Sequence, residues 1–436
     1  MLNNGFSKVT TEDSYAKSIE GLDRFQSEAV TSHAENVVLR APAGSGKTKS
    51  IIAAIAAYRY EHINDRICAI TYTRAARAEM EARLQELGVY DVEVTTIHVW
   101  SRNLLKDLSI KYGFFIKILE EPQIKAILEE IVAEYIRYSK VKKININILY
   151  TYITGSKNMD ITDNYRRTLN ALEARYINYK RDNGLYDFTD YPLYLFNVLE
   201  TYDEFIYNID ALFVDEFQDV DEIQLEIFKK VLSNKKFYVG DAWQSIFQFR
   251  GADGLVFSKL EDFKEYKLKY NYRSYQEIID YAANVYLHLQ NFAKNEEECY
   301  ISEVMYSQSS GITCSRGYGG NVTVINPFGR IFDVQKRKQS AIQFFKDFMA
   351  QKPMILCRTN KQVKAIEEQK YFDVSTVHQA KGLEYPNVIV IDTTIKNSED
   401  LNIAYVAMTR AENNLLIINW QQFEQFFDLY MNYGGN

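Results

Sequence analysis

The chain has 436 residues and a formal net charge of −7, and its hydrophobic, aromatic and charged fractions are ordinary for a globular protein. This length exceeds what one compact core can hold and predicts two to four structural units. The negative charge excludes a uniformly basic nucleic-acid coat but allows a basic channel inside an acidic protein. The four cysteines lack metal-ligand spacing, and we find no signal peptide or membrane-length apolar run, so we expect a soluble, cytoplasmic protein without membrane contact.

Short β-branched runs alternate with helical patterns at both ends of the chain. This alternation predicts an α/β fold in which parallel sheets are joined by crossover helices. The expected strands of the first part are Val37–Arg40, Ile67–Thr71, Val92–Thr96, Ala211–Asp215 and Phe237–Gly240. The expected strands of the second part are Tyr266–Tyr270, Val322–Ile325, Met354–Arg358, Val374–Val377, Val388–Ile391 and Leu415–Ile418.

Between Leu104 and Asp182 the apolar residues recur at helical spacing, which predicts a helical insertion in the first sheet domain. The stretch from Pro122 to Arg181 holds eleven Lys and Arg against six Asp and Glu, a local excess of five positive charges, with seven tyrosines interleaved. Such a surface suits single-stranded nucleic acid, because cations follow the phosphates and rings stack on bases. The same composition fits a solvated helical face equally well.

A glycine-rich segment follows the first expected strand: Ala41-Pro42-Ala43-Gly44-Ser45-Gly46-Lys47-Thr48. It precedes a helical stretch, and a strand, a glycine loop and a helix in this order form a phosphate-binding loop. Backbone N–H groups of the loop and of the helix N-terminus point at a polyphosphate. We therefore expect Lys47 to reach the outer phosphates and the hydroxyl of Thr48 to ligate Mg²⁺.

Two adjacent carboxylates, Asp215 and Glu216, stand at the carboxyl end of another expected strand. Ligands bind at that edge of a parallel sheet. Together with a phosphate loop, the pair can divide its work: Asp215 would hold Mg²⁺, directly or through water, and Glu216 would polarise the attacking water.

Further motifs follow one another in a fixed order. They are Leu22–Val30, Ile70–Ala76, Thr96–His98, Val239–Asp253, Asn271–Ser274, Arg358–Asn360, Ser375–Glu384 and Tyr405–Ala411. With the loop and the acidic pair, this set resembles the superfamily 1A DNA helicases of the UvrD/Rep/PcrA type. Ala41 at the first position of the loop is usual in that family.

The resemblance implies two RecA-like P-loop domains that sandwich ATP and Mg²⁺. The implied catalytic residues are Lys47, Asp215, Glu216, Gln244, Arg273 and Arg410. The implied nucleotide-binding residues are Gln26, Ala43, Gly44, Ser45, Gly46, Lys47, Thr48, Lys49, Tyr272 and Glu384, and the metal ligands are Thr48 and Asp215. In the family pattern, Gln26 reads the adenine edge, Tyr272 packs on adenine and Glu384 binds the ribose. Gln244, Arg273 and Arg410 meet the γ-phosphate.

The resemblance also implies a set of nucleic-acid contacts. These residues are Tyr72, His98, Phe247, Phe249, Arg250, Asn360 and His378. Trp243 departs from the family pattern, in which an acidic or small polar residue is commoner at that position.

The implied domains are a first RecA-like domain at 1–103 and 183–264, a helical accessory insertion at 104–182 and a second RecA-like domain at 265–436. Family members usually carry a second accessory subdomain between the Arg-Thr-Asn and Thr-Val-His motifs. Here only fifteen residues, Lys361 to Ser375, occupy that place, which is too few for a self-sufficient core. We therefore expect a compact form in which that subdomain is missing.

The function that follows is an ATP-dependent translocase and 3′→5′ helicase, a monomer that acts on single-stranded DNA and on junctions of single and double strands. The polarity is carried from the resemblance, and the sequence does not reveal a loading partner. An ATP-gated nucleic-acid-binding accessory protein without unwinding activity is the alternative. RNA as the track stays open, because no residue decides against the 2′-hydroxyl.

Overall fold

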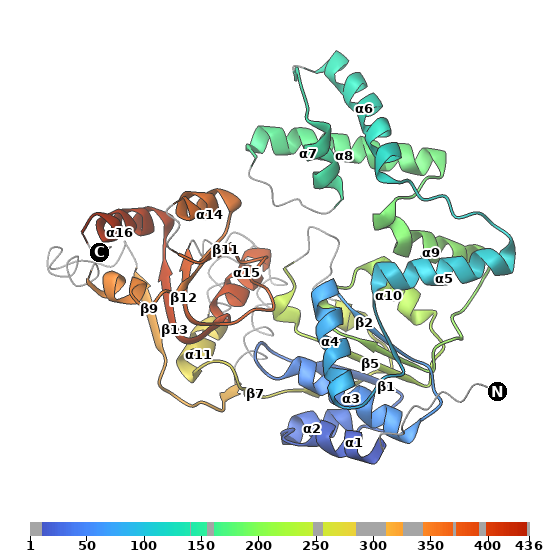
Figure 1. Cartoon of the computed structure of the whole chain (residues 1–436), viewed down its shortest axis with the longest axis horizontal. Helices are drawn as coiled ribbons and strands as arrows, with labels where there is room; N and C mark the ends of the chain where they lie inside the picture. Colours follow the sequence, from blue (N-terminus) through green and yellow to red (C-terminus); the bar gives the residue numbers. More distant parts are fainter. Residues whose placement is uncertain are drawn as a thin grey trace.

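The computed structural model describes residues 11–139, 141–154, 161–246, 256–284, 311–325, 343–368, 372–391 and 398–433. Figure 1 shows two α/β lobes side by side, with a helical unit projecting from the first lobe. In the described part of the chain, each lobe contains one main parallel sheet, of six strands in the first lobe and five in the second. The α/β fold class with two parallel-sheet domains is thus confirmed. Within the described residues, no helix is long and apolar enough to cross a bilayer.

The sheet of the first lobe is parallel throughout. Its strands, in spatial order, are β3 (Val92–Thr96), β2 (Ile67–Thr71), β4 (Ala211–Val214), β5 (Lys235–Gly240), β1 (Asn36–Arg40) and β6 (Lys264–Lys267). β2 and β4 are buried at every position, as expected for apolar strands covered by helices on both faces. One core contains α3 (Lys47–Glu61), and the other contains α5 (Ile97–Tyr112), α9 (Tyr191–Thr201) and α10 (Glu222–Lys229).

The strand expected at Tyr266–Tyr270 in the second part was placed in the wrong sheet. β6 begins at Lys264 and pairs in parallel with β1, so it is the edge strand of the first lobe. Among the residues that the structure describes, the next strand, β7 (Tyr270–Asn271), pairs with β8 (Thr313–Cys314) and with no other strand. β6 is a charged, largely exposed segment, which suits an edge strand but gives little apolar signal. The expected domain boundary at 264/265 therefore falls inside a strand of the first sheet.

The helical unit has a core of its own, built from α6 (Glu121–Tyr138), α7 (Ile146–Ile153) and α8 (Asp163–Asn183). The chain leaves the first lobe at Ile118 and returns at Tyr186, and these two residues form an isolated parallel bridge. The expected start of the insertion at Leu104 lies within α5, whose buried residues pack in the core of the first lobe. The separate unit thus begins after that helix.

The tyrosines of the helical unit belong mainly to its core. Tyr152 and Tyr176 are buried, and four others pack partly buried against the same cluster. Tyr138, which is 83% exposed, is the exception among the seven. The expectation of an aromatic surface for base stacking is therefore not supported here, and the solvated basic helical face is the better description.

The second lobe has a parallel sheet and two apolar cores. Its strands, in spatial order, are β11 (Val374–Thr376), β10 (Met354–Cys357), β12 (Tyr385–Ile391), β13 (Ala411–Ile418) and β9 (Asn321–Ile325). Its described helices are α11 (Gln276–Asn284), a helical segment at 343–349, α14 (Asn360–Glu367), α15 (Ser398–Met408) and α16 (Trp420–Tyr433). α14 lies between β10 and β11 in the chain, in the short segment where the resemblance implies that an accessory subdomain is missing. The first lobe contributes Ala43, Trp243 and Ile246 to one of these cores, which joins the lobes through apolar contact.

The remaining described helices and turns have the following bounds: α1 (Thr11–Ile19), α2 (Arg24–Val30), α4 (Arg74–Glu86), η1 (Phe188–Asp190), η2 (Phe217–Asp219), η3 (Ala242–Gln244) and η5 (Val256–Lys259).

Candidate active site

The glycine-rich loop connects the carboxyl end of β1 to the N-terminus of α3. Gly44 and Gly46 adopt φ values of +70° and +82°, which side chains with a Cβ rarely adopt, and Gly46 is the N-cap of α3. Ser45 closes a tight turn, since its N–H and its Oγ both donate to the carbonyl of Pro42, at 3.1 and 2.7 Å. The loop thus precedes a helix N-terminus whose free N–H groups favour a bound anion.

The acidic pair stands where β4 ends, and it meets the loop lysine directly. Lys47 Nζ lies 2.5 Å from Glu216 Oε2. Glu216 itself has a φ of +52°, a strained left-handed conformation for a residue with a side chain. Its backbone N–H donates to Asp215 Oδ1 at 2.8 Å, so the carboxylate of Asp215 is held by the backbone of the turn.

The electrostatics of this cluster separate the two acids. Burial raises the pKa of Asp215, and the neighbouring charge of Glu216 raises it further. Burial acts in the same direction on Glu216, but the ammonium groups of Lys47 and Lys381 reverse the effect and lower its pKa below the usual range. Glu216 is therefore held ionised by cations.

Arg273 and the two residues before it in the chain, Asn271 and Tyr272, lie against this loop. A Cβ built on Gly44 would lie 2.8 Å from the Cβ of Arg273, so the absence of a side chain at Gly44 permits this approach. Asn271 Nδ2 donates to the carbonyl of Ala43 at 2.7 Å, and the N–H of Tyr272 donates to the carbonyl of Gly44 at 2.8 Å. Arg273 Nε pairs with Glu384 Oε2 at 2.6 Å.

Arg410 is 1% exposed and meets Gln244 of the first lobe, where its NH2 group donates to Gln244 Oε1 at 3.3 Å. Its remaining N–H groups donate to the carbonyls of Val406 and Leu383. Burial and the charge of Arg273 lower the pKa of Arg410 to about 9, which still leaves the guanidinium charged at neutral pH.

Gln26 and Tyr272, the residues expected to contact adenine, both lie against the loop. Gln26 Nε2 donates to the carbonyl of Ser45 at 2.9 Å, and its Oε1 accepts from the N–H of Asp23 at 3.0 Å. Tyr272 donates its hydroxyl to Asp23 Oδ2 at 2.6 Å while its ring stays 43% exposed. The amide of Gln26 thus braces the loop, and an exposed ring stands beside it at the place expected for adenine.

Comparison with known proteins agrees with this geometry. Residues 22–265, more than half of the chain, match the UvrD/REP helicase N-terminal domain, and residues 371–418 match the UvrD-like helicase C-terminal domain. The chain belongs to the UvrD/REP helicase family.

Individual relatives give the same result at modest identity. The chain is 27% identical to a probable DNA helicase of Mycoplasma pneumoniae over 461 aligned positions, which cover 92% of this chain and 84% of that protein. It is 28% identical to the ATP-dependent DNA helicase PcrA of Bacillus subtilis, over 80% of this chain and 49% of PcrA. It is 30% identical to the ATP-dependent DNA helicase Rep of Buchnera aphidicola, over 57% of this chain and 42% of Rep. The chain thus spans half or less of the length of the PcrA and Rep proteins.

In this UvrD/REP family member, the structure brings most of the expected ATP-site residues together. Lys47, Asp215 and Glu216 gather on one side of the loop, and Arg273 lies against Gly44. The side chain of Lys49 points elsewhere, because its Nζ donates to the carbonyl of Gly21 at 2.8 Å. Glu384 pairs with Arg273 and its side chain stays 53% exposed, so its contact with a ribose stays a prediction.

The expected nucleic-acid residues occupy matching places in the two lobes. Tyr72 and His98 follow the carboxyl ends of β2 and β3, which are paired neighbours. Asn360 and His378 follow the ends of β10 and β11, which are paired neighbours in the second sheet. The remaining three, Phe247, Phe249 and Arg250, lie outside the described residues.

Sequence reasoning missed several residues that the structure places at this site. Lys381 reaches across the lobes to Asp219, with Nζ–O distances of 2.6 and 2.9 Å, and both side chains are buried. Phe188 is 51% exposed and stacks on His98, with ring centroids 5.5 Å apart. Trp243, the departure from the family pattern, is 6% exposed in the apolar contact between the lobes. Each of these residues can be seen in the sequence, but no sequence spacing indicates that Lys381 contacts Asp219 or that Phe188 contacts His98.

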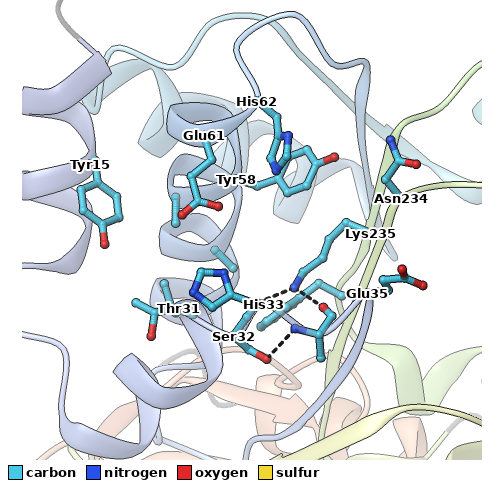
Figure 2. A pocket seen from close by; sticks show the side chains of 15 residues that line it. Tyr15, Thr31, Ser32, His33, Glu35, Tyr58, Glu61, His62, Asn234 and Lys235 are labelled. Atoms are coloured by element: carbon cyan, nitrogen blue, oxygen red, sulfur yellow. Dashed lines mark hydrogen bonds between the residues drawn. The ribbon is translucent and has the colours of Figure 1, made fainter.

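A cavity of about 310 Å³ lies elsewhere on the first lobe (Figure 2). Tyr58 and Glu61, near the carboxyl end of α3, line it, so it faces the end of the helix opposite the phosphate loop. Lys235 at its edge donates to the carbonyls of Ser32 and Ala34, at 2.7 and 2.6 Å. No residue expected to bind ATP or DNA lines this cavity, which is therefore separate from the candidate active site.

Proposed function

We propose that the chain is an ATP-hydrolysing motor that translocates along single-stranded DNA with 3′→5′ polarity. The observation that carries the proposal is the division of the site between lobes. Lys47 and Glu216 come from one lobe, while Arg273 and Arg410 come from the other and meet Gly44 and Gln244. If ATP hydrolysis requires residues of both lobes, it is coupled to the relative movement of the lobes.

Each residue has a defined task in such a site. Lys47 would leave Glu216 and bind the outer phosphates, which frees the carboxylate to accept a proton from the attacking water. Arg273 and Arg410 would stabilise the charge on the transferring phosphoryl group from the opposite side.

The oxygen donors of Thr48 and Asp215 suit Mg²⁺, a hard cation that takes one or two protein oxygens together with phosphate oxygens. The raised pKa of Asp215 supports this fit, because a buried carboxylate beside another one gains from a nearby cation. When bound, the ion neutralises charge on the β- and γ-phosphates.

Coupling to a strand follows from the places of the expected DNA contacts. Tyr72 and His98 move with the first lobe, and Asn360 and His378 move with the second. Opening and closing around ATP would change the spacing between these two pairs. Stacking on rings tolerates any base, which suits a motor that steps along an arbitrary sequence. The polarity rests on the family resemblance alone, and we propose that the motor works as a monomer.

The purified chain should hydrolyse ATP slowly alone and at least tenfold faster with single-stranded DNA, because strand contacts on both lobes favour the closed site. The measurement is steady-state ATPase with and without an oligodeoxynucleotide, with a matched oligoribonucleotide as the control for track chemistry. Displacement of a labelled strand from 3′-tailed and 5′-tailed duplexes, run beside it, reports the polarity. We expect activity on the 3′ tail.

Four outcomes would contradict the proposal or the expected unwinding. ATP turnover that does not depend on DNA would contradict the motor function. Stimulation by RNA alone would mean that the motor moves along RNA and not along DNA. Nucleotide-dependent DNA binding without turnover would favour an ATP-gated clamp that holds DNA for another enzyme. Stimulated ATPase without strand displacement would leave a translocase that does not unwind duplexes.

Replacing Phe188 with alanine should weaken binding to single-stranded DNA by about 5- to 150-fold, since one ring–base stack contributes roughly 1–3 kcal/mol. The ring is half exposed and stacks on His98, one of the expected DNA contacts. Phe115→Ala is the matched control, because that ring is 90% exposed on the same lobe. Fluorescence anisotropy with a labelled oligonucleotide measures both affinities. Equal affinities for the two variants would exclude Phe188 from the strand path.

A further inference from the structure

Gln218 is fully buried between the ends of two strands of the first sheet. It sits in η2, two residues after the catalytic glutamate. Its Nε2 donates a hydrogen bond to Oε2 of Glu216. Its Oε1 accepts a hydrogen bond of 2.9 Å from the backbone N–H of Asp241, which follows the last residue of β5. Both ends of the amide are thus engaged, one with the carboxylate and one with the neighbouring strand.

The end of β5 is shaped for this amide. A Cβ built on Gly240 would overlap Oε1 of Gln218 and would lie 3.0 Å from the backbone nitrogen of Phe217. Gly240 has no positive φ, so the need for glycine is one of space rather than of conformation. Any side chain at that position would push the glutamine away from the strand and from Glu216.

The contact continues beyond β5 to the other lobe. The carboxylate of Asp241 accepts from the Nε2 of Gln244 at 2.9 Å, and the Oε1 of Gln244 accepts from Arg410 at 3.3 Å. Gln218 therefore stands between the hydrolytic carboxylate and the residues through which the second lobe meets the first.

We infer that Gln218 is a positioning residue that holds the carboxylate of Glu216 in the orientation needed for hydrolysis, an inference that rests on the proposed ATPase function. Among the described residues, the hydrogen bonds to this carboxylate, from Lys47 and from Gln218, both fall on Oε2. When Lys47 turns to the phosphates, Gln218 is the donor that stays. It keeps Oε2 anchored to β5 and leaves Oε1 to face the attacking water.

The test replaces Gln218 with methionine, which has nearly the same shape but makes neither hydrogen bond. Misplacing a catalytic group by about 1 Å costs on the order of 100-fold, so we expect kcat to fall by roughly 10- to 100-fold with KM for ATP changed less than threefold. Gln224→Met is the matched control, because Gln224 is also buried and donates to a carboxylate, that of Asp221, away from the loop. That variant should keep its kcat.

A double variant distinguishes a positioning role of Gln218 from a general loss of structure. In the Glu216→Gln protein, adding Gln218→Met should lower kcat no further, because the glutamine acts through the glutamate. Multiplying losses would overturn the inference, as would a kcat within twofold of wild type for the single variant. If Gln218→Met fails to fold, Gly240→Ala is used instead, since its Cβ would overlap Oε1 of Gln218 and displace the amide without adding a charge beside Glu216. A wild-type chain without ATPase activity would contradict the proposed function itself, whereas an active wild type with an unaffected Gln218 variant would contradict only this inference.

Discussion

Replacing Glu216 with glutamine should lower kcat for ATP hydrolysis by about 10²- to 10⁴-fold, the usual contribution of a general base. The amide has nearly the same shape but cannot accept the proton of the attacking water. ATP should bind as tightly as before or more tightly, because Lys47 would no longer be paired with a carboxylate at 2.5 Å. Steady-state ATPase and binding of a fluorescent nucleotide measure the two effects separately.

Glu222→Gln provides the control for this substitution. Glu222 lies six residues further along, in the first turn of α10, and its side chain is 76% exposed beside Lys259. An exposed pair of this kind contributes little to stability, so the control should keep full activity. Equal ATP consumption by wild type and Glu216→Gln would remove the glutamate from the reaction and favour the ATP-gated clamp over the motor.

The parts of the site that could be predicted from the sequence are those encoded by contiguous residues. The segment from Ala41 to Thr48 must form a loop between a strand and a helix, and its glycines permit the backbone that the structure has. Asp215 and Glu216 follow an apolar run, so the end of that run places them at the sheet edge. In both cases the order of neighbouring residues along the chain was sufficient to predict where these residues lie in the fold.

Contacts between distant residues could not be predicted in this way. The bond from Lys381 to Asp219 joins positions 162 residues apart, and no periodicity encodes such a distance. The same holds for Phe188 on His98 and for Gln218 on Asp241, since each partner looks like an ordinary polar or aromatic residue when viewed alone. Whether such residues contact one another depends on which strands lie side by side in the folded sheet.

Two outcomes depended on tertiary packing rather than on local pattern. The interleaved tyrosines of the helical unit fit either a stacking surface or a solvated helical face, yet Tyr152 and Tyr176 are buried in the core that α6, α7 and α8 share. The sequence predicts that the segment at Tyr266 begins the second domain. In the structure, Lys264–Lys267 form the charged edge strand of the first sheet. In each case tertiary packing decided what local pattern left open.

Replacing Arg410 with alanine should lower kcat by about 10³- to 10⁵-fold, the range found when an arginine that faces a transferring phosphoryl group is lost. ATP affinity should change far less, because the loop and Lys47 lie on the other lobe. The measurement is kcat and KM at saturating single-stranded DNA. Thermal melting is needed beside it, since Arg410 is 1% exposed and donates to the carbonyls of Val406 and Leu383, which the substitution leaves unpaired.

Arg410→Lys distinguishes two roles of this side chain, stabilising the transition state and holding the second lobe together. Lysine keeps the charge and much of the packing but lacks the planar fork that can hold two carbonyls and Gln244 at once. If Arg410 stabilises the transition state, the lysine variant should melt near the wild-type temperature and still lose most of its kcat. If the arginine only holds the second lobe together, kcat should follow the melting temperature in both variants. An alanine variant that melts like wild type and loses less than tenfold in kcat would mean that ATP is not hydrolysed between the two lobes, and the motor would lose its physical basis.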